Sequence, residues 1–278
     1  MIYTREENVI KIRDVSQFNI EHILECGQVF CYEKTKEGYI VFPGDKYAKI
    51  IAGWEGYQII TDDANYFIDW FDLDNDYNQI KNKLNTFKIM KEPIKYGYGI
   101  RILKQDLFEM LVSFIISANN NIKRIKLILN NLRTRLGENI NGRHTFPSYE
   151  KLSGCSEEFF KECGAGYRAS YLVKVLKQIT PELLERMRSL PTKELRSWLI
   201  GLSGVGPKVA DCVLLFGYNR FDVFPVDTWI VQMYNSFYSP LENREKISKN
   251  LVDEFGLLSG YAQQYLFYFQ RSFIGGKS

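Results

Sequence analysis

The feature that most constrains the fold of this chain is a change of hydrophobic pattern at Gly97-Tyr98-Gly99. Before this point, from Val9 to about Ile60, short apolar and aromatic runs are separated by turns that contain Gly or Asp, which predicts an antiparallel meander. The predicted strands are Gln28–Tyr32, Tyr39–Phe42, Tyr47–Ile51 and Tyr57–Ile60. We expect helices near residues 67–71 and 77–90 to cover one face of this sheet.

After residue 99, apolar residues recur at helical spacing, and short loops join the segments. The first helix holds Leu107, Met110 and Phe114 behind Asp106, whose carboxylate is a candidate N-cap. Further helices are predicted at 122–136, 157–163, 168–178, 181–188, 192–200, 207–217, 227–237, 243–254 and 259–272. The predicted fold class is therefore α+β. An N-terminal antiparallel β-sheet domain with flanking helices, residues 1–98, precedes a mostly α-helical pair of domains, residues 99–278.

Charge is distributed unevenly between these two parts. Residues 1–98 hold 12 Lys and Arg against 16 Asp and Glu, a net charge of −4, which leaves 24 against 17, a net charge of +7, for residues 99–278. A basic surplus on one part of a chain favours a polyanionic partner for that part. A solvated surface rich in lysine would give the same composition, so both interpretations stay open at this point.

The cysteines and histidines argue against a metal centre. The five cysteines contain no CxxC pair, and only two histidines accompany them: Cys26, Cys31, Cys155, Cys163, Cys212, His22 and His144. We therefore expect no metal and no cofactor. The N-terminus carries no apolar signal core, and no apolar run reaches the ~18 residues that suggest a membrane span. We expect a monomer with reduced thiols and no targeting segment, cytoplasmic and nucleoid-associated if the source is prokaryotic.

A glycine-rich segment, Leu202 to Ala210, lies between two of the predicted helices and forms with them a helix-hairpin-helix motif at about residues 192–217. Gly204 and Gly206, on either side of Val205, permit a tight hairpin and leave backbone N–H groups open, while Pro207 suits the first turn of the next helix. Such N–H groups at a helix N-terminus bind anions. A hairpin that grips phosphate supplies affinity without sequence preference.

Two side chains of this region are candidates for chemistry. Lys208 falls in the first helical turn, where the helix dipole and partial burial would both disfavour its protonated form, so its amine is a candidate nucleophile. Asp227 ends the following loop, where it would cap the next helix and lie near that amine. A simple phosphate contact for Lys208 and a purely capping role for Asp227 are the structural alternatives.

The run from Gly204 to Cys212, followed by Val226-Asp227, resembles the helix-hairpin-helix DNA glycosylases that carry a Gly/Pro-rich loop and an aspartate. Within that superfamily the chain is most similar to the 8-oxoguanine DNA glycosylase/AP lyase family. The resemblance extends over five blocks that cover most of the chain. It implies duplex DNA with 8-oxoguanine opposite cytosine as the partner, and Lys208 and Asp227 as the catalytic residues.

Two of the blocks, together with Cys212, imply a base pocket to which the sheet domain contributes. Cys26-Gly27-Gln28-Val29-Phe30 is similar to the family motif in which the Gly carbonyl accepts the N7 hydrogen of the oxidised guanine. Gly260 to Phe267 resembles the block in which Gln263 reads the Watson-Crick edge and Phe267 stacks on the base. Gln263 and Phe267 are four residues apart, as are Lys208 and Cys212, so each pair shares one helix face. Ordinary core packing is the structural alternative for Phe267 and Cys212. A slot of this kind is needed because the reacting sugar carbon is unreachable within the duplex.

Two other blocks imply contacts around the vacated stack. In Ser113 to Arg124, the resemblance places Asn119, with Asn120 beside it, in the gap left by the extruded nucleotide, and Arg124 against the widowed cytosine. In Gly166-Tyr167-Arg168-Ala169, Tyr167 wedges the stack and Arg168 addresses the opposite base. A polar helix terminus and turn is the structural alternative for the asparagines.

The function implied is a bifunctional glycosylase and lyase of base excision repair. Lys208 attacks C1′ to form a Schiff base, and β-elimination then cuts the strand. The alternatives are an alkylated-base glycosylase without lyase activity and a non-catalytic helix-hairpin-helix DNA-binding protein. The sequence also departs from the family at Trp229, where human-type members carry His, and at Tyr268-Phe269-Gln270, which lacks their acidic residue.

Overall fold

The computed structural model describes residues 2–274, which form two compact units. The first unit contains residues 2–41, 47–104 and 220–274, and the second contains residues 42–46 and 105–219. The predicted α+β class is confirmed, since an antiparallel sheet with helices belongs to the first unit and the second is mostly helical. The domain boundary predicted at residue 99 stays a prediction.

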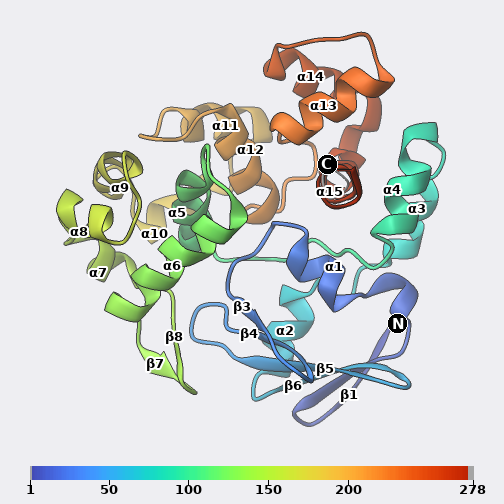
Figure 1. The fold of residues 1–278 in the computed structure, drawn as a ribbon, viewed down its shortest axis with the longest axis horizontal. Helices are drawn as coiled ribbons and strands as arrows, with labels where there is room; N and C mark the ends of the chain where they lie inside the picture. The colour runs from blue at the N-terminus through green and yellow to red at the C-terminus, as the bar shows by residue number, and fades with distance from the viewer. Residues whose placement is uncertain (1, 275–278) are drawn as a thin grey trace. The chain divides into compact units, whose positions relative to one another are not determined.

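The first unit is built on a six-stranded antiparallel sheet in the order β1-β2-β6-β5-β4-β3 (Figure 1). Its strands are β1 (Tyr3–Glu6), β2 (Val9–Ile12), β3 (Tyr32–Lys34), β4 (Gly38–Val41), β5 (Ala48–Gly53) and β6 (Gly56–Thr61). The last four strands form the predicted meander, and the hairpin β1-β2 joins it through the pairing of Ile10 with Ile59. In β2, Ile10 and Ile12 are buried while Val9 and Lys11 are partly exposed, as expected for a strand with one covered face.

One predicted strand segment is wrong: residues 28–31 lie outside the sheet, and β3 begins at Tyr32. These residues are buried, but Gln28 forms hydrogen bonds from its side chain to backbone groups of other segments. The amide Nε2 of Gln28 donates to the carbonyl oxygens of Ile23, at 2.9 Å, and Arg101, at 2.8 Å. Its Oε1 accepts from the backbone N–H of Leu103 at 2.9 Å, so Gln28 holds residues 101–103 in place instead of pairing in a strand.

The helices of the first unit come from both ends of the chain: α1 (Ile20–Glu25), α2 (Ala64–Trp70), α3 (Tyr77–Leu84), α4 (Lys91–Tyr96), α13 (Thr228–Phe237), α14 (Arg244–Phe255) and α15 (Ser259–Phe269). As expected, α2 packs against strands β2 and β6 of the sheet. The helix predicted at 77–90 is shorter, because α3 ends at Leu84 and a separate 3-10 turn covers Lys88–Met90. The helix α15 is buried along most of its length, packs against α4, α13 and α14, and continues as a π-helical turn, Gln270–Ile274.

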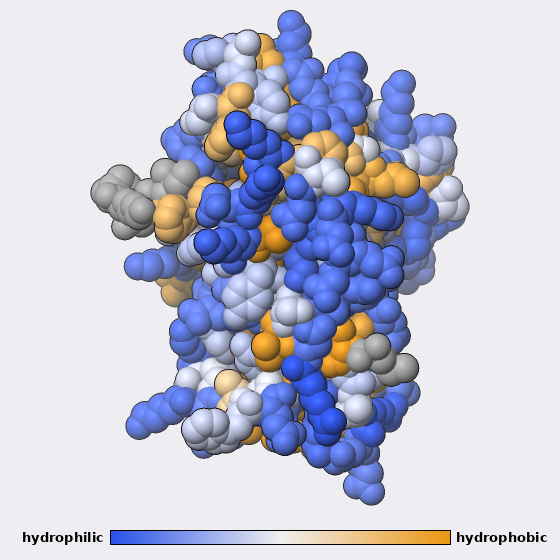
Figure 2. Space-filling model, turned by 90° about the vertical axis from the view of Figure 1, so that its right-hand side faces the viewer, coloured by the Kyte–Doolittle hydropathy of each residue, from blue (hydrophilic) through white to orange (hydrophobic). Residues whose placement is uncertain are grey.

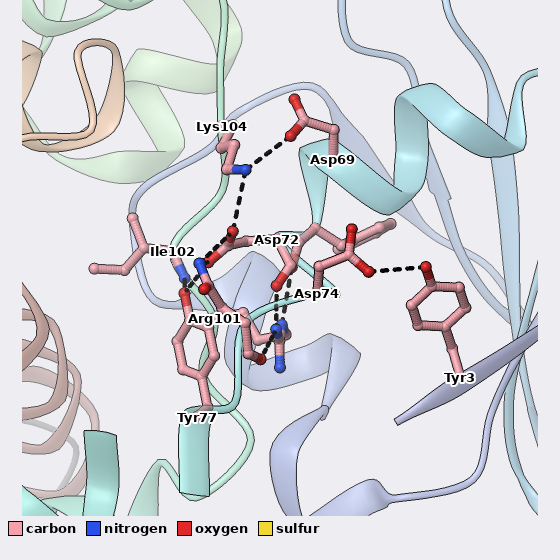
Figure 3. A network of polar contacts seen from close by, with 10 residues as sticks. Tyr3, Asp69, Asp72, Asp74, Tyr77, Arg101, Ile102 and Lys104 are labelled. Atoms are coloured by element: carbon pink, nitrogen blue, oxygen red, sulfur yellow. Dashed lines mark hydrogen bonds and ion pairs between the residues drawn. The ribbon is translucent and has the colours of Figure 1, made fainter. Parts of the chain in front are cut away.

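A polar network fixes the segment that follows α4 within the first unit (Figure 3). Arg101 is fully buried, lies 4.1 Å from the ring of Tyr77, and donates to four backbone carbonyls, those of residues 17, 71, 72 and 75. The Tyr77 hydroxyl donates to Asp72 at 3.1 Å and accepts from the N–H of Ile102 at 3.0 Å. Lys104 forms ion pairs with Asp69 and Asp72. A buried charge needs such a full set of partners to be tolerated.

The second unit is helical apart from one small hairpin. Its elements are α5 (Leu107–Ser117), α6 (Ile122–Leu136), β7 (Asn139–Ile140), β8 (Arg143–His144), α7 (Tyr149–Ser153), α8 (Glu157–Glu162), α9 (Arg168–Leu176), α10 (Pro181–Met187), α11 (Thr192–Ile200) and α12 (Pro207–Phe216). Every residue of α5 is buried, because α6, α9, α10 and α12 pack around it. The predicted cap is confirmed, since the Asp106 carboxylate accepts from the N–H of Glu109 at 2.7 Å.

Hydrophilic side chains predominate on the face drawn in Figure 2, where hydrophobic ones appear in separate small groups. Scattered apolar groups of this kind are normal on protein surfaces. Among residues 2–274, no helix combines the length and the apolar character needed to cross a membrane.

Candidate active site

The predicted hairpin between α11 and α12 is present in the second unit. Leu202 and Val205 close it through a backbone bond of 3.1 Å, and Gly204 adopts a φ of +80° that glycine accommodates most easily. Gly206 is the N-cap of α12, and Pro207 follows in its first turn. The hairpin is anchored at Ser203, whose N–H donates to Gln178 Oε1 at 2.8 Å. Gly206 and Pro207 are exposed, so the N-terminus of α12 faces solvent as an anion site requires.

An aromatic side chain supports this hairpin from α9. A Cβ atom added at Gly204 would lie 2.6 Å from the Cβ of Tyr171, so the backbone of the hairpin rests directly on that residue. Tyr171 in turn contacts Tyr167, with ring centroids 6.0 Å apart in an edge-to-face arrangement. Both rings are exposed. The hairpin and the predicted wedge residue Tyr167 are therefore linked through Tyr171.

Lys208 lies in the first turn of α12, half-buried, with its amine directed toward α5. Its Nζ donates to Ser117 Oγ at 3.5 Å and lies 5.3 Å from the ring centroid of Phe114. Phe114 is itself stacked on Phe216, with centroids 5.4 Å apart. Cys212 follows one turn later on α12 and is buried. The amine thus lies beside the ring of Phe114 and the hydroxyl of Ser117.

The two helices of the hairpin motif are fixed to one another by a buried ion pair. Arg196 on α11 forms a bidentate contact with Asp211 on α12, at 2.6 and 3.1 Å. The Asp211 carboxylate is almost fully buried, and paired hydrogen bonds of this geometry are strong and directional. The pair therefore joins the two helices on either side of the hairpin.

The predicted gap-filling residues lie on the loop between α5 and α6. Asn119 is exposed and has a φ of +50°, a conformation that asparagine tolerates better than most residues. Asn120 donates to the carbonyl of Ile116 at 3.1 Å, and Asn121 caps α6 by accepting from the N–H of Arg124 at 2.9 Å. The side chain of Arg124 is exposed. The polar helix terminus expected as an alternative is therefore present, and it presents Asn119 outward.

Arg168 holds this loop from the start of α9. Its guanidinium is buried, and it donates from Nε to the carbonyl of Ala118 at 2.8 Å and from Nη2 to that of Asn119 at 2.8 Å. A further bond reaches the carbonyl of Ala165. Contact between Arg168 and an opposite base would require some of these bonds to break, so that expected role stays a prediction. The hydroxyl of Tyr167 lies 3.4 Å from the same Ala118 carbonyl.

The predicted base-reading residues belong to the first unit. Gly27 follows α1 with a φ of +85° and is partly exposed. Gln264 of α15 donates to the carbonyl of Cys26 at 2.8 Å, which ties the segment before Gly27 to α15. Gln263 is buried, and its Oε1 has no hydrogen-bond donor among the residues that the structure describes. Phe267, one turn later, is partly exposed. Gly27, Gln263 and Phe267 are thus carried by two directly bonded segments.

Asp227 caps α13, as its position in the sequence predicts. Its Oδ1 accepts from the N–H of Ile230 at 3.0 Å. Trp229, the departure from the family pattern, is the second residue of this helix and is partly exposed. Asp227 belongs to the first unit and Lys208 to the second, so the expected proximity of the two side chains stays a prediction.

Three supporting residues escaped the sequence interpretation: Ser117, Tyr171 and Gln178. Ser117 stands in the same motif block as Asn119, which is the signal that pointed nearest to it. Tyr171 lies four residues after Tyr167, the N-cap of α9, and this helical spacing is the signal that could have pointed to it. Within residues 2–274, no set of three His, Cys, Asp or Glu side chains is arranged to hold a metal ion.

Comparison with known proteins gives matches over nearly the whole chain. A family model described as 8-oxoguanine DNA glycosylase, N-terminal domain, matches residues 10–111, and one described as HhH-GPD superfamily base excision DNA repair protein matches residues 112–255. The chain is 37% identical over 188 residues to the N-glycosylase/DNA lyase OGG1 of Arabidopsis thaliana. That match covers 61% of this chain and 51% of the Arabidopsis protein, so the chain matches about half the length of that relative.

Other similar proteins match at greater coverage. A probable N-glycosylase/DNA lyase of Methanothermobacter thermautotrophicus is 30% identical over 226 residues, which are 71% of this chain and 70% of that protein. Among solved structures, the 8-oxoguanine glycosylase/lyase of Clostridium acetobutylicum, in complex with double-stranded DNA containing cytosine opposite 8-oxoguanine, has a TM-score of 0.92 and 36% identity. That match covers 99% of both chains. A 3-methyladenine DNA glycosylase from Archaeoglobus fulgidus, at 17% identity and a TM-score of 0.72, shares the fold.

Proposed function

Because the chain belongs to the 8-oxoguanine DNA glycosylase/AP lyase family of the helix-hairpin-helix base excision repair superfamily, we propose that it excises 8-oxoguanine from duplex DNA and then cleaves the strand. The observation that carries this proposal is the placement of Lys208. Its amine stands in the first turn of the hairpin helix, 5.3 Å from the face of Phe114, with Cys212 one turn away.

The chemistry starts when the N-glycosidic bond breaks and the base departs with the bonding electron pair, taking up a proton. The deprotonated Nζ of Lys208 forms a bond to C1′, and opening of the sugar ring gives a protonated Schiff base. Loss of a proton from C2′ then expels the 3′ phosphate and cuts the strand. Asp227, held as the cap of α13 by its bond to Ile230, stabilises the positive charge that develops at the sugar.

Base selection is assigned to the first unit. The carbonyl of Gly27 accepts the N7 hydrogen that 8-oxoguanine has and guanine lacks, while Gln263 reads the Watson-Crick edge and Phe267 stacks on the ring. Gln263 suits this role because its buried Oε1 lacks a donor among the described residues, and an unsatisfied buried acceptor favours a ligand that supplies one. The family resemblance also assigns Cys212, on α12, to base recognition.

Contacts with the rest of the duplex are assigned to the second unit. The hairpin at Gly204, Val205 and Gly206 binds backbone phosphate, and Tyr167 wedges the stack. On the neighbouring loop, Asn119 fills the vacated gap, Asn120 shapes that loop, Arg124 contacts the widowed cytosine and Arg168 supports the same contact. The exposure of Asn119, Arg124 and Tyr167 supports these roles. A single copy of the chain is expected to act alone, which the mass of its DNA complex in solution tests.

Borohydride trapping tests the nucleophile. Wild-type protein incubated with a duplex containing 8-oxoguanine opposite cytosine is expected to form a covalent complex, and Lys208→Gln is expected to form none. Lys161→Gln is the matched control, because Lys161 is an exposed lysine on α8 that pairs with Glu157 at 2.7 Å. A covalent complex with Lys208→Gln would remove Lys208 from its assigned role.

A panel of duplexes separates the alternatives. We expect release of 8-oxoguanine and strand cleavage, strongest opposite cytosine when each of the four bases is tried. Release of 3-methyladenine without strand cleavage would instead identify an alkylated-base glycosylase. Tight binding with neither release nor cleavage would identify a DNA-binding protein.

A further inference from the structure

The end of α15 lacks the acidic residue that human-type members of the family carry just after the stacking Phe. In its place the chain has Tyr268-Phe269-Gln270, and the next residue is Arg271. Arg271 lies in the π-helical turn that extends α15 and is half-buried. A cation therefore directly follows the stretch that lacks the family's acidic residue, and its contacts indicate what it does.

Arg271 joins the two base-reading segments of the first unit. Its Nη2 donates to the backbone carbonyl of Glu25, two residues before Gly27. Its guanidinium carbon lies 5.2 Å from the ring centroid of Phe267 and 5.9 Å from that of Tyr268. The same side chain thus contacts the residue predicted to stack on the base and the segment whose carbonyl is predicted to recognise N7.

A second bond from α15 acts on the adjacent residue of that segment. Gln264 Nε2 donates to the carbonyl of Cys26 at 2.8 Å. The carbonyls of Glu25 and Cys26 are therefore both held by side chains of one helix and its extension. The next carbonyl is that of Gly27, which has a φ of +85°. Because glycine has little conformational preference of its own, the direction of its carbonyl depends on how the neighbouring peptide units are held.

The two ionisable side chains of the held segment, Cys26 and Glu25, do not replace the Glu25 carbonyl as the partner of Arg271. Burial raises the pKa of the Cys26 thiol to about 11, so the adjacent sulfur is a neutral thiol and does not form an ion pair with the guanidinium. The carboxylate of Glu25 accepts from the Tyr32 hydroxyl at 2.8 Å. A hydrogen bond from a charged donor to a partly buried carbonyl is stronger than one between neutral groups.

We propose that Arg271 is a specificity-determining positioning residue, which, with Gln264, clamps the Glu25-Cys26 segment and so fixes the direction of the Gly27 carbonyl relative to Phe267. This inference rests on the proposed function. It predicts that Arg271 acts in base recognition and has no part in strand cleavage at a site where the base is already absent.

The test compares two reactions of the same protein. Release of 8-oxoguanine needs the base pocket, whereas cleavage at a preformed abasic site needs only DNA binding and Lys208. In Arg271→Met, we expect single-turnover release of 8-oxoguanine to fall by about ten- to a hundredfold, the range given by the roughly 1.5–3 kcal/mol of a hydrogen bond to a charged group. Cleavage of the abasic duplex should stay within about twofold of wild type, since the substitution leaves Lys208, Asp227 and the proposed DNA-binding residues unchanged.

Three companion variants make the result specific. Arg271→Lys retains a charged donor and should recover most of the release rate, while Gln264→Met removes the other half of the clamp and should reproduce the loss. Arg5→Met is the matched control, because Arg5 lies on the edge strand β1 of the same unit and bonds to Asn65. In a Lys208→Gln background, adding Arg271→Met should lower the ratio of affinities for duplexes with 8-oxoguanine and with guanine.

The outcomes separate this inference from the function beneath it. An equal loss of base release and abasic-site cleavage, or release unchanged within twofold, would overturn the assignment to Arg271. Failure of the wild-type protein to release 8-oxoguanine at all, with abasic-site cleavage intact, would overturn the proposed substrate instead. Selective loss of release, restored by lysine, would support the clamp.

Discussion

Replacing Gly204 by alanine tests whether the hairpin holds its shape against α9. Gly204 has a φ of +80°, and an added Cβ would lie 2.6 Å from the Cβ and 2.9 Å from the Cγ of Tyr171. No rotamer of Tyr171 relieves the first contact, because its Cβ is fixed to the backbone of α9. The substitution must therefore move either the hairpin or the helix.

The expected cost has two parts. A residue other than glycine in the left-handed region costs roughly 1–2 kcal/mol, and overpacking against a fixed neighbour costs about 1–3 kcal/mol more. Gly204→Ala should therefore lower the free energy of unfolding by about 2–5 kcal/mol. If the hairpin shifts to escape the contact, its N–H groups lose their aim at phosphate, and DNA affinity should fall by about tenfold, which corresponds to ~1.4 kcal/mol.

Urea unfolding followed by circular dichroism measures the first effect. Fluorescence anisotropy with a duplex that carries an uncleavable abasic analogue measures the second. Gly142→Ala is the matched control, because Gly142 also has a positive φ, +77°, yet nothing lies within 4 Å of an added Cβ. That variant should show only the backbone cost, about 1–2 kcal/mol, with unchanged DNA affinity. Equal stability of the two variants, together with wild-type affinity for Gly204→Ala, would refute the reasoning.

Three further predictions concern charge and support. Burial lowers the pKa of His22 from 6.5 to about 4, so the neutral imidazole contributes stability above pH 6.5 that is lost as the pH falls toward 4. Between pH 7 and pH 5 the free energy of unfolding should fall by about 1–2 kcal/mol, after allowance for the exposed part of the ring. In His22→Gln, urea unfolding should show a smaller fall between the same two pH values. Glu109→Gln leaves the buried guanidinium of Arg133 without its ion-pair partner, so urea unfolding should show a free energy of unfolding lower by about 3–5 kcal/mol. A loss below about 1 kcal/mol would contradict the importance of this ion pair. Arg168→Met removes three hydrogen bonds to the carbonyls of Ala118 and Asn119 in the loop between α5 and α6, so it should weaken binding to the abasic-analogue duplex by tenfold or more. Unchanged affinity would count against a role of this loop in DNA binding.

Elements were predicted most accurately where the hydrophobic spacing and the residues that cap or end the element indicate the same boundaries. The helix predicted at 122–136 has those bounds in the structure, because Asn121 caps its start and the chain leaves helical geometry at Gly137. The six residues of α1 went unpredicted, since a helix that short has too few turns to show a period. The run at 28–31 was mistaken for a strand because burial on all sides gives an apolar run whatever the backbone does.

In the candidate site, too, the features set by local sequence were predicted, and those set by contacts between distant segments were not. That Lys208 and Cys212 share a helix face followed from their spacing, and the capping role of Asp227 followed from its place before α13. The bonds that support the site join distant segments, as in the contact of Arg168 with the carbonyl of Ala118, fifty residues earlier. Sequence patterns report local geometry, so they did not predict the hydrogen bonds from Arg168 to the Asn119 loop or the contact of Gly204 with Tyr171.

The first unit contains segments from both ends of the chain, so it can fold completely only after the C-terminal segment has been synthesised. Gln264 and Cys26 are 238 residues apart, so at about 5–20 residues per second a ribosome adds Gln264 on the order of 10–50 seconds after it has added Cys26. Residues 105–219, with the hairpin and Lys208, are finished earlier. Translation that stops before α15 therefore yields a chain that carries Lys208, the proposed nucleophile, without the helix to which base recognition is assigned.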